Sequence, residues 1–304
     1  MDMYQKRKMR KENKNTNIED NKSIAKTNIN WYPGHMAKAK RQIKEKLNLI
    51  DIVYEVIDAR IPYSSKIKDI SDIINNKKKI LIINKKDLCD EEETLKWVKF
   101  YEKKYPCLLI DINNKKDLNK LIDLTKKETK DIIAKRKEKG LINEEIKALV
   151  IGIPNVGKST LINSLVGKNV VETANKPGVT KGINWLKSKS NISLMDTPGI
   201  LWPKLDEENV AINLALTGSI KKEILDITTL CNYLLLFYKK YYGSILCNYG
   251  LNDKMEIDDM YEILANKMGA KINSEIDYNR IANRLYNDFI NGKIKGVTLD
   301  RWQK

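Results

Sequence analysis

The residues best suited to chemistry in this chain lie in short polar segments that follow apolar runs. Gly152 to Ser159 reads G-x-x-x-x-G-K-S, follows the run KALVIGI and opens the amphipathic stretch STLINSLV. In that context loop amides and a helix N-terminus cradle phosphates, Lys158 neutralises β- and γ-phosphate oxygens, and Ser159 binds magnesium. The residues predicted to contact the nucleotide in this loop are Asn155, Val156, Gly157, Lys158, Ser159 and Thr160.

A second group of residues would complete the phosphate end of the site. Asp196 opens the segment D-T-P-G at the end of the apolar run ISLM. A carboxylate there holds magnesium through water, and the amide of Gly199 reaches the γ-phosphate. Thr180 lies in the polar stretch between this segment and the phosphate loop. We predict that Thr180 is the switch threonine on magnesium, with Thr173 as the alternative.

The segment Asn84-Lys85-Lys86-Asp87 follows the apolar run KILIIN and has the residues that select a base. Asp87 can accept hydrogen bonds from N1 and N2 of guanine, a pair of donors that adenine lacks, and such a site rejects the analogue strongly. We expect Asn84 to brace the base and the neighbouring loops, and the Lys85 stem to pack on the ring. Asn113 and Asn114, after the next apolar run, are assigned to a third base-side loop by position alone.

The order of these motifs along the chain is rotated. A GTPase ordinarily runs from the phosphate loop through the switches to the base-recognition motif, whereas here the base-recognition motif comes first. Cutting and rejoining a chain in this way leaves the sheet that holds the loops unchanged. The sequence therefore predicts a circularly permuted P-loop GTPase domain with GTP as substrate and Mg²⁺ as cofactor.

The elements that must position these motifs are visible as alternating patterns. Apolar runs rich in Ile, Val and Leu predict mostly parallel strands at 50–59, 79–84, 107–112, 147–153 and 192–196. Amphipathic stretches near 36–49, 67–76, 92–104, 117–138 and 158–166 predict crossover helices. This is a doubly wound α/β fold, with ligand sites at the carboxyl ends of the strands. We divide the chain into a disordered basic arm (1–27), the permuted GTPase domain (28–204) and an all-α domain (205–304).

Composition narrows the class of protein. The chain has 304 residues and a formal net charge of +16, and the surplus lies before residue 205, because residues 205–304 hold 13 basic and 14 acidic side chains. A basic surface favours a polyanionic partner such as RNA. No long uncharged apolar run or secretory leader is present, so we expect a cytoplasmic protein without a membrane segment. The four cysteines are scattered singly, and we expect ordinary apolar packing for them rather than a zinc site.

The last part of the predicted all-α domain nevertheless contains several basic side chains. Arg280 and Arg284 lie one helical turn apart, and Lys293 and Lys295 follow. These four residues are predicted to bind phosphates of structured RNA, with a plain solvated helix face as the alternative. The aromatic residues between 233 and 242 have helical spacing, which favours a place in the core over a base-stacking platform. Arg60, after Asp58, fits either an RNA or switch contact or an ion pair at a strand end.

Together with three further segments, these motifs resemble one family. The segments are Trp31–Ala39 (W-Y-P-G-H-M-A-K-A), Asp58-Ala59-Arg60, and D-T-P-G-I-L-W-P beginning at Asp196. With them, residues from about 29 to 304 closely resemble the bacterial ribosome biogenesis GTPase A family. The resemblance implies a factor that binds a late precursor of the large ribosomal subunit through ribosomal RNA and proteins, hydrolyses GTP there and leaves. We expect a monomer.

The chemistry of hydrolysis departs from Ras-like enzymes. Those enzymes carry a glutamine after the D-x-x-G motif that orients the attacking water, whereas this chain has Ile200, which cannot hydrogen-bond water. The family assigns catalysis to the position of His35, the only histidine, although sequence alone favours a structural histidine there. Similar GTPases use the position of Asn155 to ligate K⁺, so potassium dependence is expected; a loop-stabilising side chain is the alternative.

Because the segment after Asp196 runs through Trp202 and Pro203 into the helical region, we expect GTP loss to reorient that region and release RNA. Two other functions remain open on the sequence. One is a switch gated by GTP occupancy that binds RNA or the ribosome with little turnover, which the missing glutamine favours. The other is a permuted GTPase of the small subunit, but the related family carries a zinc module that this chain cannot build.

Overall fold

The computed structural model describes residues 41, 43–68, 70–75, 77–141, 144–167, 185–197, 207–221 and 224–302. His35, Thr180 and Gly199 lie outside the described residues, as do the predicted arm 1–27 and the segment around Trp202. The predicted domain boundaries at 27/28 and 204/205 therefore remain predictions. Among the described helices, none has both the length and the apolar character that a membrane crossing requires.

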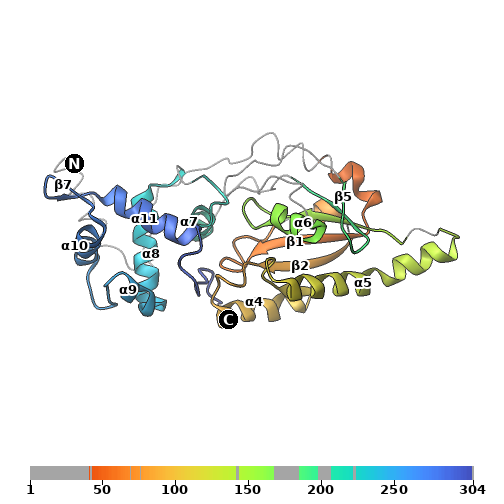
Figure 1. Ribbon diagram of the computed structural model, residues 1–304, viewed down its shortest axis with the longest axis horizontal. Coiled ribbons are helices and arrows are strands. Elements are labelled where there is room, and N and C mark those ends of the chain that lie inside the picture. The colour runs from red at the N-terminus through yellow and green to blue at the C-terminus, as the bar shows by residue number, and fades with distance from the viewer. Residues whose placement is uncertain are drawn as a thin grey trace.

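A six-stranded sheet forms the centre of the first part of the chain (Figure 1). Its strands are β1 (Ile52–Asp58), β2 (Lys78–Asn84), β3 (Cys107–Leu109), β4 (Ile146–Ile151), β5 (Trp185–Lys187) and β6 (Ile192–Met195), in the order β3-β2-β1-β4-β6-β5. All neighbouring strands are parallel except β5, which runs antiparallel to β6 at the edge. Strand β4, which leads into the phosphate loop, therefore lies inside the sheet between β1 and β6.

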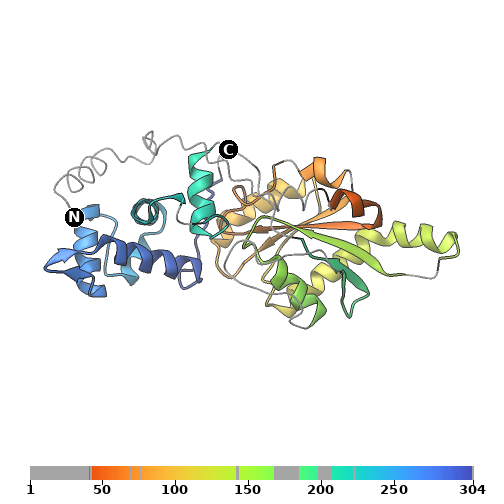
Figure 2. The same ribbon diagram turned by 90° about the horizontal axis from the view of Figure 1, so that it is seen from above.

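Helices cover both faces of this sheet (Figure 2). Leu81 and Ile83 of β2 share an apolar cluster with Trp97 of α4 (Glu91–Glu102). Ile80 and Ile82, the alternate residues of the same strand, belong to the cluster that contains α5 (Lys115–Glu138) and α6 (Lys158–Val166). The short elements η1 (Leu47–Leu49) and α3 (Ile70–Ile74) complete this part. Burial on both faces explains why the strand sequences are continuous apolar runs.

The chain after residue 207 is mainly helical, as predicted. Its helices are α7 (Glu208–Leu216), α8 (Ile227–Tyr241), α9 (Gly243–Asn248), α10 (Ile257–Met268) and α11 (Tyr278–Ile290), and a small hairpin joins β7 (Lys271–Ile272) to β8 (Glu275–Ile276). The sequence did not predict the hairpin. Helix α11 has one strongly apolar face, with Ile281, Leu285 and Phe289 buried, and it contacts α8. This part is called the helical region below.

The end of the chain returns to the α/β part. The backbone amide of Leu299 donates to the carbonyl of Arg60 at 2.7 Å, and the Trp97 indole N–H donates to the carbonyl of Asp300 at 2.9 Å. The Asp300 carboxylate accepts hydrogen bonds from Ser64 and from Asn213 of α7, and burial raises the pKa of Asp300 to about 6. The helical region is therefore attached beside the carboxyl ends of β1 and β2, where the motifs lie.

Candidate nucleotide-binding site

The loop between β4 and α6 is tight because its backbone enters the left-handed region twice. Asn155 has a φ of 63° and Gly157 a φ of 100°. A β-carbon on Gly152 would lie only 2.4 Å from the carbonyl oxygen of Val56 on the neighbouring strand, so this position requires glycine. Helix α6 begins at Lys158, directly after the turn, and leaves its first backbone amides for a ligand. A phosphate bound at this loop would therefore meet the N-terminus of α6 and its first backbone amides.

Asn84, at the end of β2, holds the phosphate loop from the side. Its Nδ2 donates to the carbonyl of Val156 at 2.8 Å, and a β-carbon on Gly157 would lie 2.3 Å from the same nitrogen. The bracing role predicted for Asn84 toward a neighbouring loop is therefore present in the structure. Asn84 Oδ1 is buried without a hydrogen-bond partner among the described residues. A buried acceptor in this state is one that a bound ligand or water would satisfy.

Lys158 and Asp196 come from adjacent parallel strands and their loops, and they meet at the same edge of the sheet. Lys158 Nζ donates to the carbonyl of Ile153 at 2.7 Å, inside the loop. Burial lowers the pKa of Lys158 to about 8, although the Asp196 carboxylate acts against this shift. Asp196 is buried at the end of β6, and α6 begins with Lys158 and Ser159. A serine hydroxyl and a carboxylate are oxygen donors of the kind that Mg²⁺ prefers, so these side chains fit the ion.

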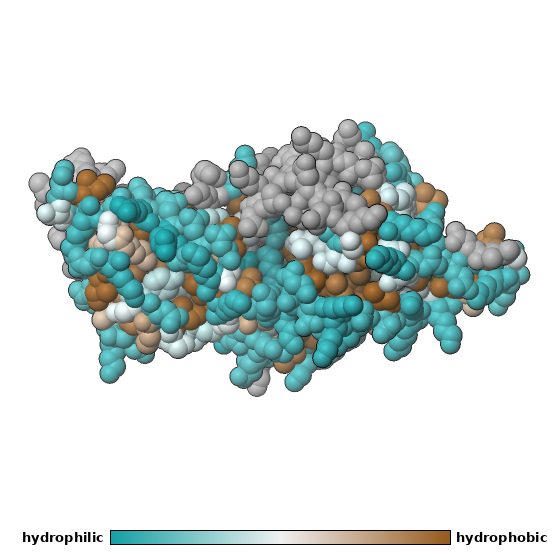
Figure 3. All heavy atoms as spheres, in the orientation of Figure 1, coloured by the Kyte–Doolittle hydropathy of each residue, from teal (hydrophilic) through white to brown (hydrophobic). Residues whose placement is uncertain are grey.

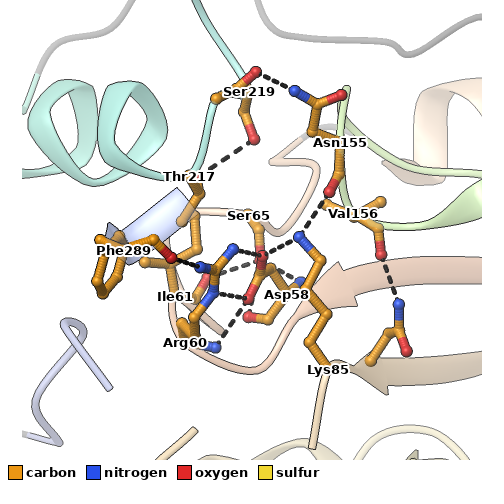
Figure 4. Close-up of polar contacts among 12 residues, drawn as sticks. Asp58, Arg60, Ile61, Ser65, Lys85, Asn155, Val156, Thr217, Ser219 and Phe289 are labelled. Carbon is orange, nitrogen blue, oxygen red and sulfur yellow. Dashed lines mark hydrogen bonds and ion pairs between the residues drawn. The ribbon is translucent and has the colours of Figure 1, made fainter. Parts of the chain in front are cut away.

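Lys85 connects the base-recognition segment to the phosphate loop (Figure 4). Its Nζ donates to the carbonyl of Asn155 at 2.7 Å and to the Asp58 carboxylate at 2.7 Å. The Asp58 carboxylate also accepts hydrogen bonds from Arg60, which is fully buried. Burial acts to raise the pKa of Asp58, but the charges of Arg60 and Lys85 outweigh it and hold this pKa well below its ordinary value. The Lys85 head group is thus used to bridge two loops.

Three of the residues predicted on the base side of the site are exposed on the surface. Asp87 is exposed, so its carboxylate is accessible to a ligand. Asn113 and Asn114 are also exposed; the Asn114 side chain caps α5 by accepting a hydrogen bond from the amide of Lys116 at 2.9 Å. Asn114 therefore has a structural role at the helix start, and the structure does not test a contact between Asn113 or Asn114 and a base.

The phosphate loop contacts the helical region directly, which the sequence did not predict. Asn155 Nδ2 donates to the carbonyl of Gly218 (Figure 4). The Ser219 hydroxyl donates to the carbonyl of Pro154 at 2.9 Å. Arg60 donates to the carbonyl of Phe289 in α11 at 3.1 Å and stacks over its ring at 5.0 Å. Two consecutive residues of the phosphate loop are thus bonded to the turn after α7. The only sequence signal for this contact is the glycine at 218.

Two open questions from the sequence are decided by burial. Arg60 forms the ion pair with Asp58 and is fully buried, so it is not a surface contact for RNA. In the aromatic group, Phe237 and Tyr238 are buried in the core and Tyr233 and Tyr242 are partly buried against it, whereas Tyr241 is exposed. The four predicted RNA-binding cations are exposed. Two of them, Arg284 and Lys293, form ion pairs with Asp288 at 3.5 Å and 3.1 Å.

The fold and these loops define the class of protein as a P-loop GTPase with a circularly permuted chain. A family described as "50S ribosome-binding GTPase" matches residues 147–261, starting on β4 and leaving out the base-recognition segment that precedes it. A protein of Bacillus licheniformis named "Ribosome biogenesis GTPase A" is 41% identical over 277 residues, covering 90% of this chain and 98% of the relative. A protein of Priestia megaterium with the same name is 40% identical over 277 residues, covering 90% and 96%.

Among solved structures, the GNP-bound YlqF from T. maritima is similar, with a TM-score of 0.61 and 28% identity over 87% of this chain and 98% of that one. The chain belongs to the ribosome biogenesis GTPase A family. It is therefore a guanine-nucleotide-binding protein that hydrolyses GTP.

Proposed function

We propose that this GTPase binds a late precursor of the large ribosomal subunit in the cytoplasm, as a monomer, and uses GTP hydrolysis to complete its own release. The names of its relatives and of the matching family support a ribosomal partner. The observation that carries the proposal is the direct bond between phosphate loop and helical region, Asn155 to Gly218 and Ser219 to Pro154. A ligand shifts a conformational equilibrium by its differential affinity for the two states, and this contact gives a nucleotide on the loop a direct route to the helical region.

The proposed roles in the site follow from the positions of the side chains. Asp87, exposed at the base side, recognises guanine, while Lys158 leaves the Ile153 carbonyl for the phosphates. Ser159, Asp196 and Thr180 would hold Mg²⁺, which when bound neutralises charge on the phosphates. The amides of Val156, Gly157, Thr160 and Gly199 complete the phosphate contacts.

The group that orients the attacking water is proposed to be His35, with charge support from K⁺ held at Asn155. The Asn155 amide nitrogen is already bonded to Gly218, so its Oδ1 is the atom that a cation would use. A neutral imidazole can position water, which Ile200 cannot do. For RNA, we propose contacts from Arg280, Arg284, Lys293 and Lys295; for Arg284 and Lys293, phosphates would have to compete with Asp288.

Turnover in the presence of ribosomal particles tests this proposal. We expect purified large subunits to stimulate GTP hydrolysis in potassium buffer, small subunits to have no effect, and sodium to support less turnover than potassium. A His35→Ala variant should bind GTP normally but lose about 10²-fold or more of the stimulated rate, the range for general acid–base groups.

Three other outcomes would change the account. Stimulation by small subunits, or by neither subunit, would refute the proposed partner. Unchanged turnover in His35→Ala would show that another group orients water. Subunit binding that depends on GTP without turnover would favour the switch gated by occupancy.

A further inference from the structure

A long stripe of lysines runs along one side of α5, in the GTPase domain. Positions 116, 120, 123, 127, 130, 134 and 137 follow one another at helical spacings of three and four, so they lie on one face. Five of these seven residues are lysines, and Asp123 is the only carboxylate among them. Lys115 and Lys126 flank the stripe. These lysines are all exposed, and we call them the α5 lysine face: Lys115, Lys116, Lys120, Lys126, Lys127, Lys130 and Lys137.

The opposite face of α5 is fixed against the sheet, so the α5 lysine face points outward. Leu121, Thr125 and Thr129 are fully buried, and the Thr125 hydroxyl is 2.7 Å from the hydroxyl of Tyr54 on β1. Figure 1 shows α5 running along the GTPase domain and continuing past the sheet, at the end of the molecule away from α10. In Figure 3, hydrophilic side chains predominate along the lower edge, where α4 and α5 lie.

Most of these lysines take no part in the ion pairs of the described residues. Within the described ranges, Lys120 pairs with Asp117 and Lys137 with Glu144, while no ion pair engages Lys116, Lys126, Lys127 or Lys130. Lys126 and Lys130 lie four residues apart on the helix, and like charges at this spacing repel and weaken a helix. A row of exposed, unneutralised cations on a helix is what a polyanion requires: each phosphate contact releases counterions and adds affinity.

We propose that the α5 lysine face is a second RNA-binding surface, which contacts the phosphate backbone of structured RNA independently of the cations in the helical region. The inference rests on the proposed function, because it assumes a ribosomal particle as the partner. The stripe from Lys116 to Lys137 is roughly 32 Å long at about 1.5 Å per residue, which is long enough for several phosphates. Structured RNA is recognised mainly through its shape and backbone, so point charges along a rigid helix suit it.

An anionic membrane is the competing partner, and the packing of α5 disfavours it. Helices that lie in a membrane interface insert an apolar face beside their basic one. The apolar side chains of α5 pack against the GTPase domain: Leu121 is fully buried, and Leu118, Ile122 and Leu124 are partly buried against the same core. The α5 lysine face has only charge to offer, which matches phosphates on RNA.

The test is a triple variant, K126Q/K127Q/K130Q, in the full chain, with K99Q/K103Q/K104Q as its control. The control removes the same charge from exposed lysines on and just after α4. Binding to purified large subunits is measured over a range of salt concentrations. For the α5 variant we expect at least tenfold weaker binding and a salt dependence reduced by about two to three phosphate contacts. For the control we expect less than a twofold change, and both variants should keep wild-type GTP turnover without subunits.

The outcomes separate this inference from the proposed function. If wild-type protein does not bind large subunits, the proposed function fails. If wild-type protein binds and the α5 variant binds equally well, with the same salt dependence, the α5 lysine face is not an RNA surface. Equal losses in the α5 variant and in the control would show a general charge effect and overturn the inference. Binding to vesicles of phosphatidylserine and phosphatidylcholine is measured as well. If the α5 variant loses vesicle binding but keeps wild-type binding to large subunits, the α5 lysine face is a membrane surface and the inference is wrong.

Discussion

Replacing Asp58 by alanine is expected to lower the free energy of unfolding by about 3–5 kcal/mol, the usual cost of removing one partner from a buried ion pair. The Asp58 carboxylate accepts hydrogen bonds from Arg60 Nη2 at 2.9 Å and from Lys85 Nζ at 2.7 Å. Without it, the fully buried Arg60 guanidinium would lose its counter-charge, and Lys85 would keep only the carbonyl of Asn155. Urea denaturation followed by circular dichroism measures the change.

Asp131→Ala is the matched control for this prediction. Asp131 also pairs with a lysine, Lys78, but both side chains are largely exposed, so its removal should change the denaturation midpoint little. If Asp58→Ala is as stable as Asp131→Ala, the network around Asp58 does not hold the loops together as described.

Replacing Asp87 by alanine is expected to weaken GTP binding by about 10²–10⁴-fold, because two hydrogen bonds to a charged acceptor contribute about 1.5–3 kcal/mol each. Asp87 is exposed at the end of the segment that Asn84 and Lys85 anchor, so its loss should leave the fold intact. The discrimination between GTP and ATP should fall at the same time, since the donors on guanine lose their acceptor. Titration with fluorescent GTP and competition with ATP measures both.

Glu91→Gln provides the comparison for Asp87→Ala. Glu91 is an exposed carboxylate near Asp87 in sequence and pairs with Lys86 at 3.0 Å, so its neutralisation removes the same charge from the same region. GTP affinity in Glu91→Gln should stay within about threefold of wild type, the range of a surface ion pair. Equal losses in both variants would mean that the charge of the region, rather than Asp87 itself, determines affinity.

The sheet could be predicted well from the sequence because its strands are buried on both faces. All five apolar runs contain strands in the structure. Helix α6 has the predicted bounds, whereas α4 and α5 begin one and two residues before the predicted stretches. The missed strand, β5, has three residues, Trp185 to Lys187, none of them fully buried. A short antiparallel edge strand lacks the continuous apolar run that burial imposes, so it leaves little signal.

The candidate site could be predicted only in part. The glycine and the residues proposed to bind phosphate, Gly157, Lys158 and Ser159, are adjacent in sequence, so the pattern alone identifies them. The contacts of Asn155 with Gly218 and of Arg60 with Phe289 join residues far apart in the chain, and no local pattern predicts such pairs. The ion pair between Asp58 and Arg60 was foreseeable as an alternative, but only burial decided for it.

These long-range contacts suggest how the nucleotide acts on the partner. Asn155 belongs to the phosphate loop and bonds the turn after α7, and we propose that a change in this loop is transmitted through this bond to the helical region. A β-carbon on Gly218, whose φ is +72°, would lie 2.7 Å from Ile290 Cδ1 and 3.0 Å from Asn155 Nδ2. A β-carbon on Gly269, whose φ is +60°, would meet no atom within 4 Å. Alanine at these two glycines therefore gives comparable backbone strain, and only Gly218→Ala disturbs the contact.

The most direct test of the account is the affinity of the full chain for purified large ribosomal subunits, measured with a non-hydrolysable GTP analogue and with GDP. We predict that wild-type protein and Gly269→Ala bind about tenfold more tightly with the analogue, a coupling in the range typical of allosteric proteins. Gly218→Ala should lose most of this difference. Equal affinities of wild-type protein in the two nucleotide states would contradict the coupling between phosphate loop and helical region.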